Sequence, residues 1–244
     1  MANKEKAEVQ DINRSMYDFR YEEKDTDFYK IQEGLTKDIV LEISEKKGDP
    51  AWMRDFRLKS LEIYNQKKVP QWGPSIDGLD MNNIVTYVKP KTKMTADWEE
   101  VPEDIKNTFE KLGIPQAERE SLAGVGAQYD SELVYHNLQK EVEEQGVVYT
   151  DIESALHGPY ADMIRDHFMH LVPPTDHKFA ALHGAVWSGG SFVYIPKGVS
   201  VEIPLQSYFR LNAPGAGQFE HTLIIVDEGA QLHFIEACSA PKYN

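Results

Sequence analysis

The sequence predicts an α+β protein in which a mainly helical N-terminal domain, residues 1–176, precedes the first coils of a β-solenoid, residues 177–244. Charge density changes along the chain, since residues 1–172 hold 22 basic and 34 acidic side chains and residues 173–244 hold only 4 and 6. Apolar residues recur at helical spacing in the first part, whereas the second part has short β-rich runs between Gly and Pro. An internal repeat in the second part favours a solenoid.

Composition limits the function classes. The chain has 244 residues and a net charge of −14, so it can bury a core but lacks the excess of cations that nucleic acids and anionic membrane surfaces attract. Its first residues are charged and its apolar runs are too short to span a bilayer, which predicts a cytoplasmic protein without a membrane segment. The single cysteine, Cys238, excludes an internal disulfide, a CxxC pair and a complete cysteine metal cage.

Two helices open the first part. Apolar residues recur every four positions ahead of Gly48, which predicts a helix over residues 35–47. A second helix is expected over residues 50–68, with Asp49 accepting hydrogen bonds from its first-turn amides and Pro50 at the first helical position.

The middle of the chain is divided by Gly and Pro. A loop over residues 70–78 and a β-rich run over 84–88 are followed by two expected helices, residues 102–112 and 130–145. Residues 121–127 contain Gly-x-Gly but lack the third glycine and a clear preceding strand, so they fail as a dinucleotide-binding fingerprint. The chain also has no P-loop motif, and any P-loop ATPase chemistry would belong to a partner.

The last third is expected to contain strands and no helix. The β-rich runs are Ser191–Ile195, Val199–Ile203, Gln206–Asn212, Phe219–Val226 and Ala230–Ala237. A shift of 31 residues superimposes residues 195–203 on residues 226–234, with Gly198 on Gly229. Two copies of strand, glycine turn and strand indicate stacked solenoid coils, with a jelly roll or cupin as the main alternative. So few coils predict a truncated solenoid that continues in a longer protein.

The first candidate site residue is Cys238. Period-two alternation places Leu232, Phe234, Glu236 and Cys238 on one face of a strand, and the first two prefer the interior. Glu236 and Cys238 would then point inward as well, which hints at a polar channel, because a buried carboxylate is costly in a dry core. The alternative is a cysteine that acts as a small buried hydrophobe.

The second candidate pair is Arg210 and Asn212, which share a polar strand face with Gln206 and Tyr208. An arginine beside the thiol would favour the thiolate, whereas Glu236 would oppose it. The alternative is that both residues belong to a solvated outer face.

Four histidines cluster in the sequence. They are His167, His170, His177 and His183. No acidic residue stands at metal-motif spacing, so structural or surface roles are favoured over a metal site, and no hydrolase nucleophile motif is present.

Several long stretches carry a specific family resemblance. They are Asp49–Lys59, Tyr149–Ser154, Val186–Gly198, Phe209–Asn212, Gly217–Gly229 and Phe234–Pro241. The chain resembles the SufB-like scaffold subunits of the SUF iron-sulfur cluster assembly system. Ala237 departs from the glycine expected before the cysteine, which affects only local backbone freedom. The resemblance implies a helical N-terminal domain, a right-handed β-helix core and a C-terminal helical part beyond this chain.

The resemblance also implies a role. Such scaffolds are not enzymes by themselves but work with a SufC-like ATPase, a SufD-like paralogue, and a cysteine desulfurase with its sulfur-transfer partner. Cys238 matches the family's persulfide acceptor, and Arg210 and Asn212 match residues of its sulfur path. The iron-sulfur cluster is transient, and its ligands are expected beyond residue 244, so no metal site is expected in this part of the scaffold.

Two other function classes stay open on the residues alone. A solenoid enzyme acting on polysaccharides would need paired carboxylates. The carboxylates available after Asp176 are Glu202, Glu220, Asp227, Glu228 and Glu236. The third possibility is a structural interaction module with an incidental thiol.

Overall fold

The computed structural model describes residues 28–90, 92–112 and 121–240. Its α-helices are α2 (Lys37–Lys47), α3 (Ala51–Gln66), α4 (Glu103–Leu112), α6 (Lys140–Glu143), α7 (Ile152–Ala155), α8 (Ala161–His167) and α9 (Lys178–Val186). Its strands are β1 (Phe28–Lys30), β2 (Val88–Pro90), β3 (Gly124–Tyr129), β4 (Glu132–Leu138), β5 (Val148–Asp151), β6 (Ser191–Ile195), β7 (Ser200–Arg210), β8 (Leu223–Val226) and β9 (Gln231–Ser239). None of the helices in these described ranges is long and apolar enough to cross a membrane.

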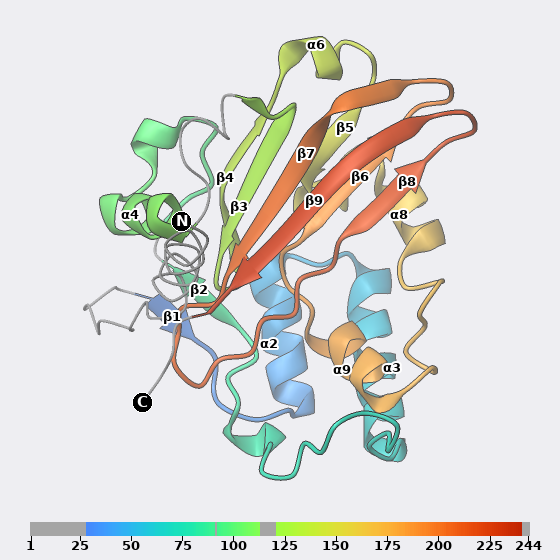
Figure 1. Cartoon of the computed structure of the whole chain (residues 1–244). Helices are drawn as coiled ribbons and strands as arrows, with labels where there is room; N and C mark the ends of the chain where they lie inside the picture. The colour runs from blue at the N-terminus through green and yellow to red at the C-terminus, as the bar shows by residue number, and fades with distance from the viewer. Residues whose placement is uncertain (1–27, 91, 113–120, 241–244) are drawn as a thin grey trace, which may run out of the picture.

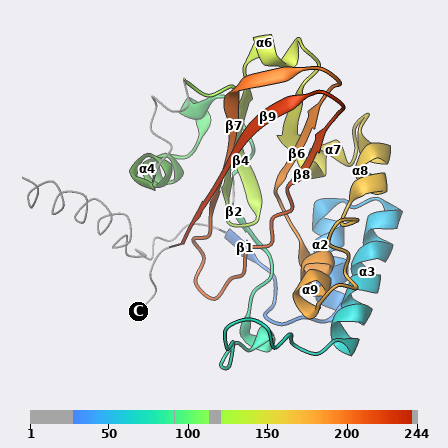
Figure 2. The same cartoon turned by 45° about the vertical axis from the view of Figure 1, so that its right-hand side comes forward.

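Two sheets form the centre of the molecule. One has the strand order β4-β3-β7-β9 and the other β5-β6-β8, while β1 and β2 form a separate pair. Figures 1 and 2 show the two larger sheets facing each other, with α4 beside the four-stranded sheet and α2, α3 and α9 grouped at one end. Tyr149, Val193 and Leu205 belong to the apolar cluster between the sheets. Phe109 of α4 packs with Val125 and Tyr208 on the opposite face of the four-stranded sheet.

The helices expected over residues 35–47 and 102–112 are confirmed as α2 and α4. Gly48 ends α2 in the left-handed conformation at φ 65°, where glycine avoids the strain of a Cβ. The second helix is confirmed as α3, but the expected capping role of Asp49 is wrong. Asp49 instead forms an ion pair with Arg57, with Oδ2 and Nε 2.6 Å apart, and both side chains are buried.

The helix expected over residues 130–145 is wrong. That segment is a hairpin turn, β4 and the short helix α6, because β4 pairs antiparallel with β3. The Gly-x-Gly of residues 124–126 lies within β3, where glycine makes room for a neighbouring ring. A Cβ on Gly124 would come within 2.9 Å of Tyr149 Cδ1, and one on Gly126 within 2.7 Å of its hydroxyl. Close packing explains these glycines.

The expectation that no helix follows residue 173 is also wrong, because α9 spans residues 178–186. His177 caps α9 by accepting the Ala180 N–H at 3.1 Å. The helix contains Ala180, Ala181, Gly184 and Ala185 among its buried residues. These small residues let α9 pack closely against α3, where a Cβ on Gly184 would meet Ser60 Oγ at 2.6 Å.

The 31-residue repeat corresponds to parallel strand pairing. Ile195 pairs with Val226 in β6 and β8, and Ser200 pairs with Gln231 in β7 and β9. The two runs expected at residues 199–203 and 206–212 form one long strand, β7, interrupted by a register shift between Val201 and Leu205. The shift pairs Leu205, rather than residue 203, with Phe234.

The proposed division at residues 176 and 177 stays a prediction. Both larger sheets take strands from each side of it, since β3 pairs with β7 and β5 pairs with β6. The change in charge density therefore does not coincide with a break in the sheets, because backbone hydrogen bonds link the two parts of the chain.

Candidate functional site

The thiol of Cys238 lies near the end of β9 and is exposed. Cys238 pairs with Phe209 of β7, and Ala237 pairs with Tyr208. Ala237 packs on the apolar cluster beneath α4, whereas Phe234 packs on the cluster between the sheets. Alternation along β9 therefore places Cys238 on the face expected from the sequence, toward the other sheet. The thiol is exposed because β9 is the last strand described in its sheet, and the polar channel expected around it stays a prediction.

Glu236 lies two residues before Cys238 on the same strand face. Its carboxylate accepts a hydrogen bond of 2.8 Å from the Thr222 hydroxyl, just ahead of β8. Deeper between the sheets, Tyr149 donates to the Gln206 carbonyl at 2.7 Å, and the Ser191 and Ser207 hydroxyls meet at 2.6 Å. Polar groups therefore line part of the space between the sheets.

Arg210 is buried at the end of β7, so the interpretation of its face as a solvated surface is wrong. It pairs in register with Ser239, and its Nη1 donates to Ser239 Oγ at 3.2 Å. The Tyr208 hydroxyl donates to the same oxygen at 2.9 Å. Arg210 and Cys238 thus occupy opposite faces of the sheet, and the guanidinium contacts the residue beside the cysteine.

The backbone at Asn212 is held by Asp130, a residue that sequence reasoning missed. One carboxylate oxygen, Oδ1, accepts the N–H of Asn212 at 2.7 Å and that of Ala213 at 2.9 Å. Burial raises the pKa of Asp130, and these two N–H groups oppose the rise. Asp130 lies in the β3–β4 turn at φ 52°, a left-handed conformation that Asp and Asn tolerate better than most residues.

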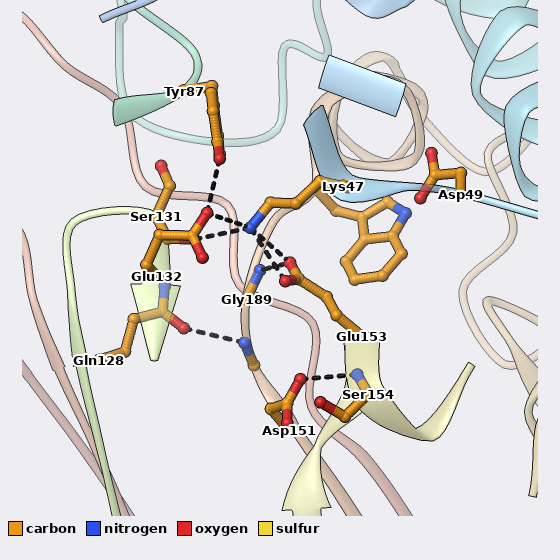
Figure 3. Close-up of polar contacts among 12 residues, drawn as sticks. Lys47, Asp49, Tyr87, Gln128, Ser131, Glu132, Asp151, Glu153, Ser154 and Gly189 are labelled. Carbon is orange, nitrogen blue, oxygen red and sulfur yellow. Dashed lines mark hydrogen bonds and ion pairs between the residues drawn. The ribbon is translucent and has the colours of Figure 1, made fainter. Parts of the chain in front are cut away.

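A buried ion cluster contacts the next residues of the same turn, Ser131 and Glu132 (Figure 3). Lys47 of α2 contacts Glu132 at 2.7 Å and Glu153 at 2.8 Å, and only 3% of its side chain is exposed. Tyr87 donates to Glu132 at 2.6 Å, and the N–H of Gly189 donates to Glu153 at 2.6 Å. The residues of the cluster come from separate segments, so the cluster joins α2, β4, α7 and the segments ahead of β2 and β6.

The charges in this cluster are mutually dependent. Burial alone would lower the pKa of Lys47, but the charges of Glu153 and Glu132 outweigh burial and raise it. Burial raises the pKa of Glu153, and the Lys47 charge opposes that rise. Removing the lysine would therefore leave two carboxylates without their shared cation.

The four histidines do not form one site. His183 contacts His221, which lies 38 residues later, with Nε2 and Nδ1 2.9 Å apart. His177 caps α9, and His167 Nδ1 contacts the Met163 carbonyl at 2.8 Å. Across residues 28–90, 92–112 and 121–240, no three His, Cys, Asp or Glu side chains are placed to hold a metal ion.

Comparison with known proteins defines the class of protein. The family model described as the SufBD protein N-terminal region matches residues 42–207. The chain therefore belongs to the SufBD family.

Particular relatives are similar over most of the chain. The iron-sulfur cluster assembly protein SufB of Bacillus subtilis is 54% identical over 227 residues, which are 93% of this chain and 49% of that protein. SufBD family proteins of Staphylococcus epidermidis and Staphylococcus aureus are 50% and 51% identical, again over 93% of this chain and 49% of the relative. The chain is SufB-like, and it spans about half the length of these relatives.

Proposed function

We propose that the chain is part of an iron-sulfur cluster assembly scaffold and receives persulfide sulfur at Cys238. The observation that supports this most directly is an exposed thiol at the end of β9 in a chain 54% identical to the SufB assembly protein of Bacillus subtilis. Family membership also favours a scaffold over the polysaccharide-active enzyme and over a module with an incidental thiol.

The architecture proposed for the scaffold is a right-handed β-helix, of which the chain forms the first coils. The parallel pairing of β6 with β8 and of β7 with β9 supports stacked coils. The offset is 31 residues throughout β6 and β8 and at the start of β7 and β9, as in Ile195 with Val226 and Ser200 with Gln231, and it becomes 29 after the register shift. Each coil would bury its apolar residues against its neighbours, as solenoids do.

The chemistry proposed at Cys238 is a transfer between sulfur atoms. The Cys238 thiolate attacks the terminal sulfur of a donor persulfide, a new sulfur–sulfur bond forms, and the donor's sulfur–sulfur bond breaks. The donor leaves as a thiolate and the thiol proton passes to solvent, so no external oxidant or reductant is needed. In the proposed sulfur path, Arg210 contacts Ser239 beside the thiol, and Asn212 follows the end of β7.

The partner proteins and the cellular compartment follow from the same proposal. The scaffold would work in the cytoplasm with a SufC-like ATPase, a SufD-like paralogue, and a cysteine desulfurase with its sulfur-transfer partner. The iron-sulfur cluster is the scaffold's product, held transiently, with ligands supplied largely outside this chain.

A chimera tests the proposed function. Residues 1–244 would replace the matching half of Bacillus subtilis SufB in cells that lack their own SufB, and the activities of iron-sulfur enzymes would be measured. The chimera is expected to restore those activities, and Cys238→Ser is expected to abolish the restoration while preserving the fold.

Each arm of this experiment has a distinct meaning. A folded chimera that restores nothing would contradict the assignment of the chain to a SufB-like scaffold. Restoration by Cys238→Ser equal to that by the unchanged chimera would contradict sulfur acceptance at this thiol.

A further inference from the structure

Asp130 lies in the β3–β4 turn, beside the Lys47 cluster, and forms hydrogen bonds through its N–H, its carbonyl and its carboxylate Oδ1. Its N–H donates to the Arg210 carbonyl at 2.7 Å. Its own carbonyl accepts the side-chain amides of Gln128 at 2.9 Å and Gln218 at 3.0 Å. Its Oδ1 accepts the two N–H groups that follow Leu211. Only 4% of the residue is exposed, so these bonds are shielded from water.

The turn that carries Asp130 is fixed to the rest of the molecule. Ser131 exchanges two hydrogen bonds with Val88, one through its N–H at 3.1 Å and one through its hydroxyl at 3.0 Å. Lys47 donates to the Ser131 carbonyl at 3.1 Å and pairs with Glu132. The two residues after Asp130 are therefore hydrogen-bonded to β2 and α2, which fix the position of the turn.

The segment that Asp130 holds is also tied to the end of β9. The Leu211 N–H donates to the Ser239 carbonyl at 3.0 Å, and Arg210 Nη1 contacts the Ser239 hydroxyl. Ser239 directly follows Cys238. A chain of hydrogen bonds thus runs from Asp130 through Arg210 and Leu211 to the backbone beside the thiol.

We infer that Asp130 is a positioning residue for sulfur receipt, because its carboxylate fixes the strand ends that present Cys238 and Asn212. This inference rests on the proposed function. Hydrogen bonds from backbone N–H groups to a buried carboxylate are stronger than those between neutral groups. Without them the N–H groups of Asn212 and Ala213 would lose this acceptor, next to the Leu211 N–H that donates to Ser239 of β9.

Two substitutions distinguish the effect of losing the Oδ1 hydrogen-bond acceptor from the effect of disturbing the turn conformation. Asp130→Asn keeps an Oδ1 acceptor and a residue that tolerates a positive φ. Asp130→Gly keeps the turn conformation without strain but removes the acceptor. The comparison between them therefore isolates the two bonds to Asn212 and Ala213.

The experiment measures three quantities on the full chain. They are the rate of labelled-sulfur transfer from a cysteine desulfurase to Cys238, the rate of alkylation of Cys238 by N-ethylmaleimide, and hydrogen exchange at the amides of Asn212 and Ala213. Asp130→Gly is expected to slow transfer and speed exchange at both amides by about tenfold or more, the scale of a lost hydrogen bond to a charged group. For Asp130→Asn, the transfer rate and the exchange rates of the two amides are expected to stay within about threefold of those of the unchanged chain, since the acceptor remains. Alkylation should be unchanged in both variants, because Cys238 stays exposed.

The outcomes distinguish this inference from the proposed function. Transfer in Asp130→Gly at the unchanged rate, or equal losses in the Gly and Asn variants, would overturn the positioning role. A fall in alkylation that matches the fall in transfer would indicate general disruption and would also overturn it. An unchanged chain that accepts no label would instead overturn the proposed function. If the Gly variant does not fold, Asp130→Ser, whose hydroxyl is too short to reach both amides, takes its place with the same expected order.

Discussion

Replacing Lys47 by Met is expected to lower the free energy of unfolding by about 3–5 kcal/mol at pH 7, the usual cost of removing one partner from a buried ion pair. Methionine preserves the length and apolar stem of the side chain, so the loss reports the missing charge. Glu132 and Glu153, about one-fifth exposed, would remain beside each other without a cation. Urea unfolding followed by circular dichroism measures the effect.

A second variant and a surface control complete this test. Adding Glu153→Gln to Lys47→Met removes one uncompensated charge and is expected to recover part of the loss. Lys140→Met removes a cation whose side chain is 82% exposed, and it is expected to change stability by less than about 0.5 kcal/mol. A loss in Lys47→Met as small as that in the control would contradict the buried-cluster account.

Acid is expected to destabilise the protein strongly through the His183–His221 pair. Burial, with a smaller contribution from the Arg57 charge, lowers the pKa of His183 to about 4. Burial, with a smaller contribution from His183, lowers the pKa of His221 to about 3. Because the unfolded chain binds these protons near pH 6.5, stability is fully present above that pH and is lost as the pH falls. The loss at pH 5 relative to pH 7 is expected to be about 2 kcal/mol for each histidine.

The variant His183→Gln isolates this contribution from that of the carboxylates. It is expected to be less stable than the unchanged chain at pH 7, because it disrupts a buried hydrogen bond. Its loss of stability between pH 7 and pH 5 should, however, be smaller by about 2 kcal/mol, since one titrating group is gone. Equal losses in the two proteins over this pH range would show that the pair does not bind protons in this way.

Local patterns in the sequence predict the parts of the fold that depend on neighbouring residues. Gly48 ends α2 as expected, and the 31-residue repeat corresponds to the parallel register of β6 with β8 and of the first residues of β7 with β9. The helix expected over residues 130–145 fails because pairing with β3, a tertiary contact, overrides an apolar spacing that suits a helix. Residues 178–186 were missed because their small buried residues lack an amphipathic stripe.

The polar clusters depend on contacts between distant parts of the chain. Lys47 lies 85 residues from Glu132 and 106 from Glu153, so no local spacing connects them. Asp130 likewise reaches Asn212 across 82 residues. One local signal was available for Asp130, because Asp followed by Ser between two strand-like runs is typical of a turn. Strand alternation placed Cys238 on the face toward the other sheet but could not predict its exposure, which depends on the neighbouring strands.

The most direct test of the central claim is transfer of labelled sulfur from a cysteine desulfurase and its sulfur-transfer partner to the folded chain. Peptide mapping would locate the label, with Cys238→Ser as the matched control. The account predicts label on the peptide that contains Cys238, released by reductant and lost in Cys238→Ser. Equal labelling of the control, or no label on a folded chain, would contradict sulfur acceptance at Cys238.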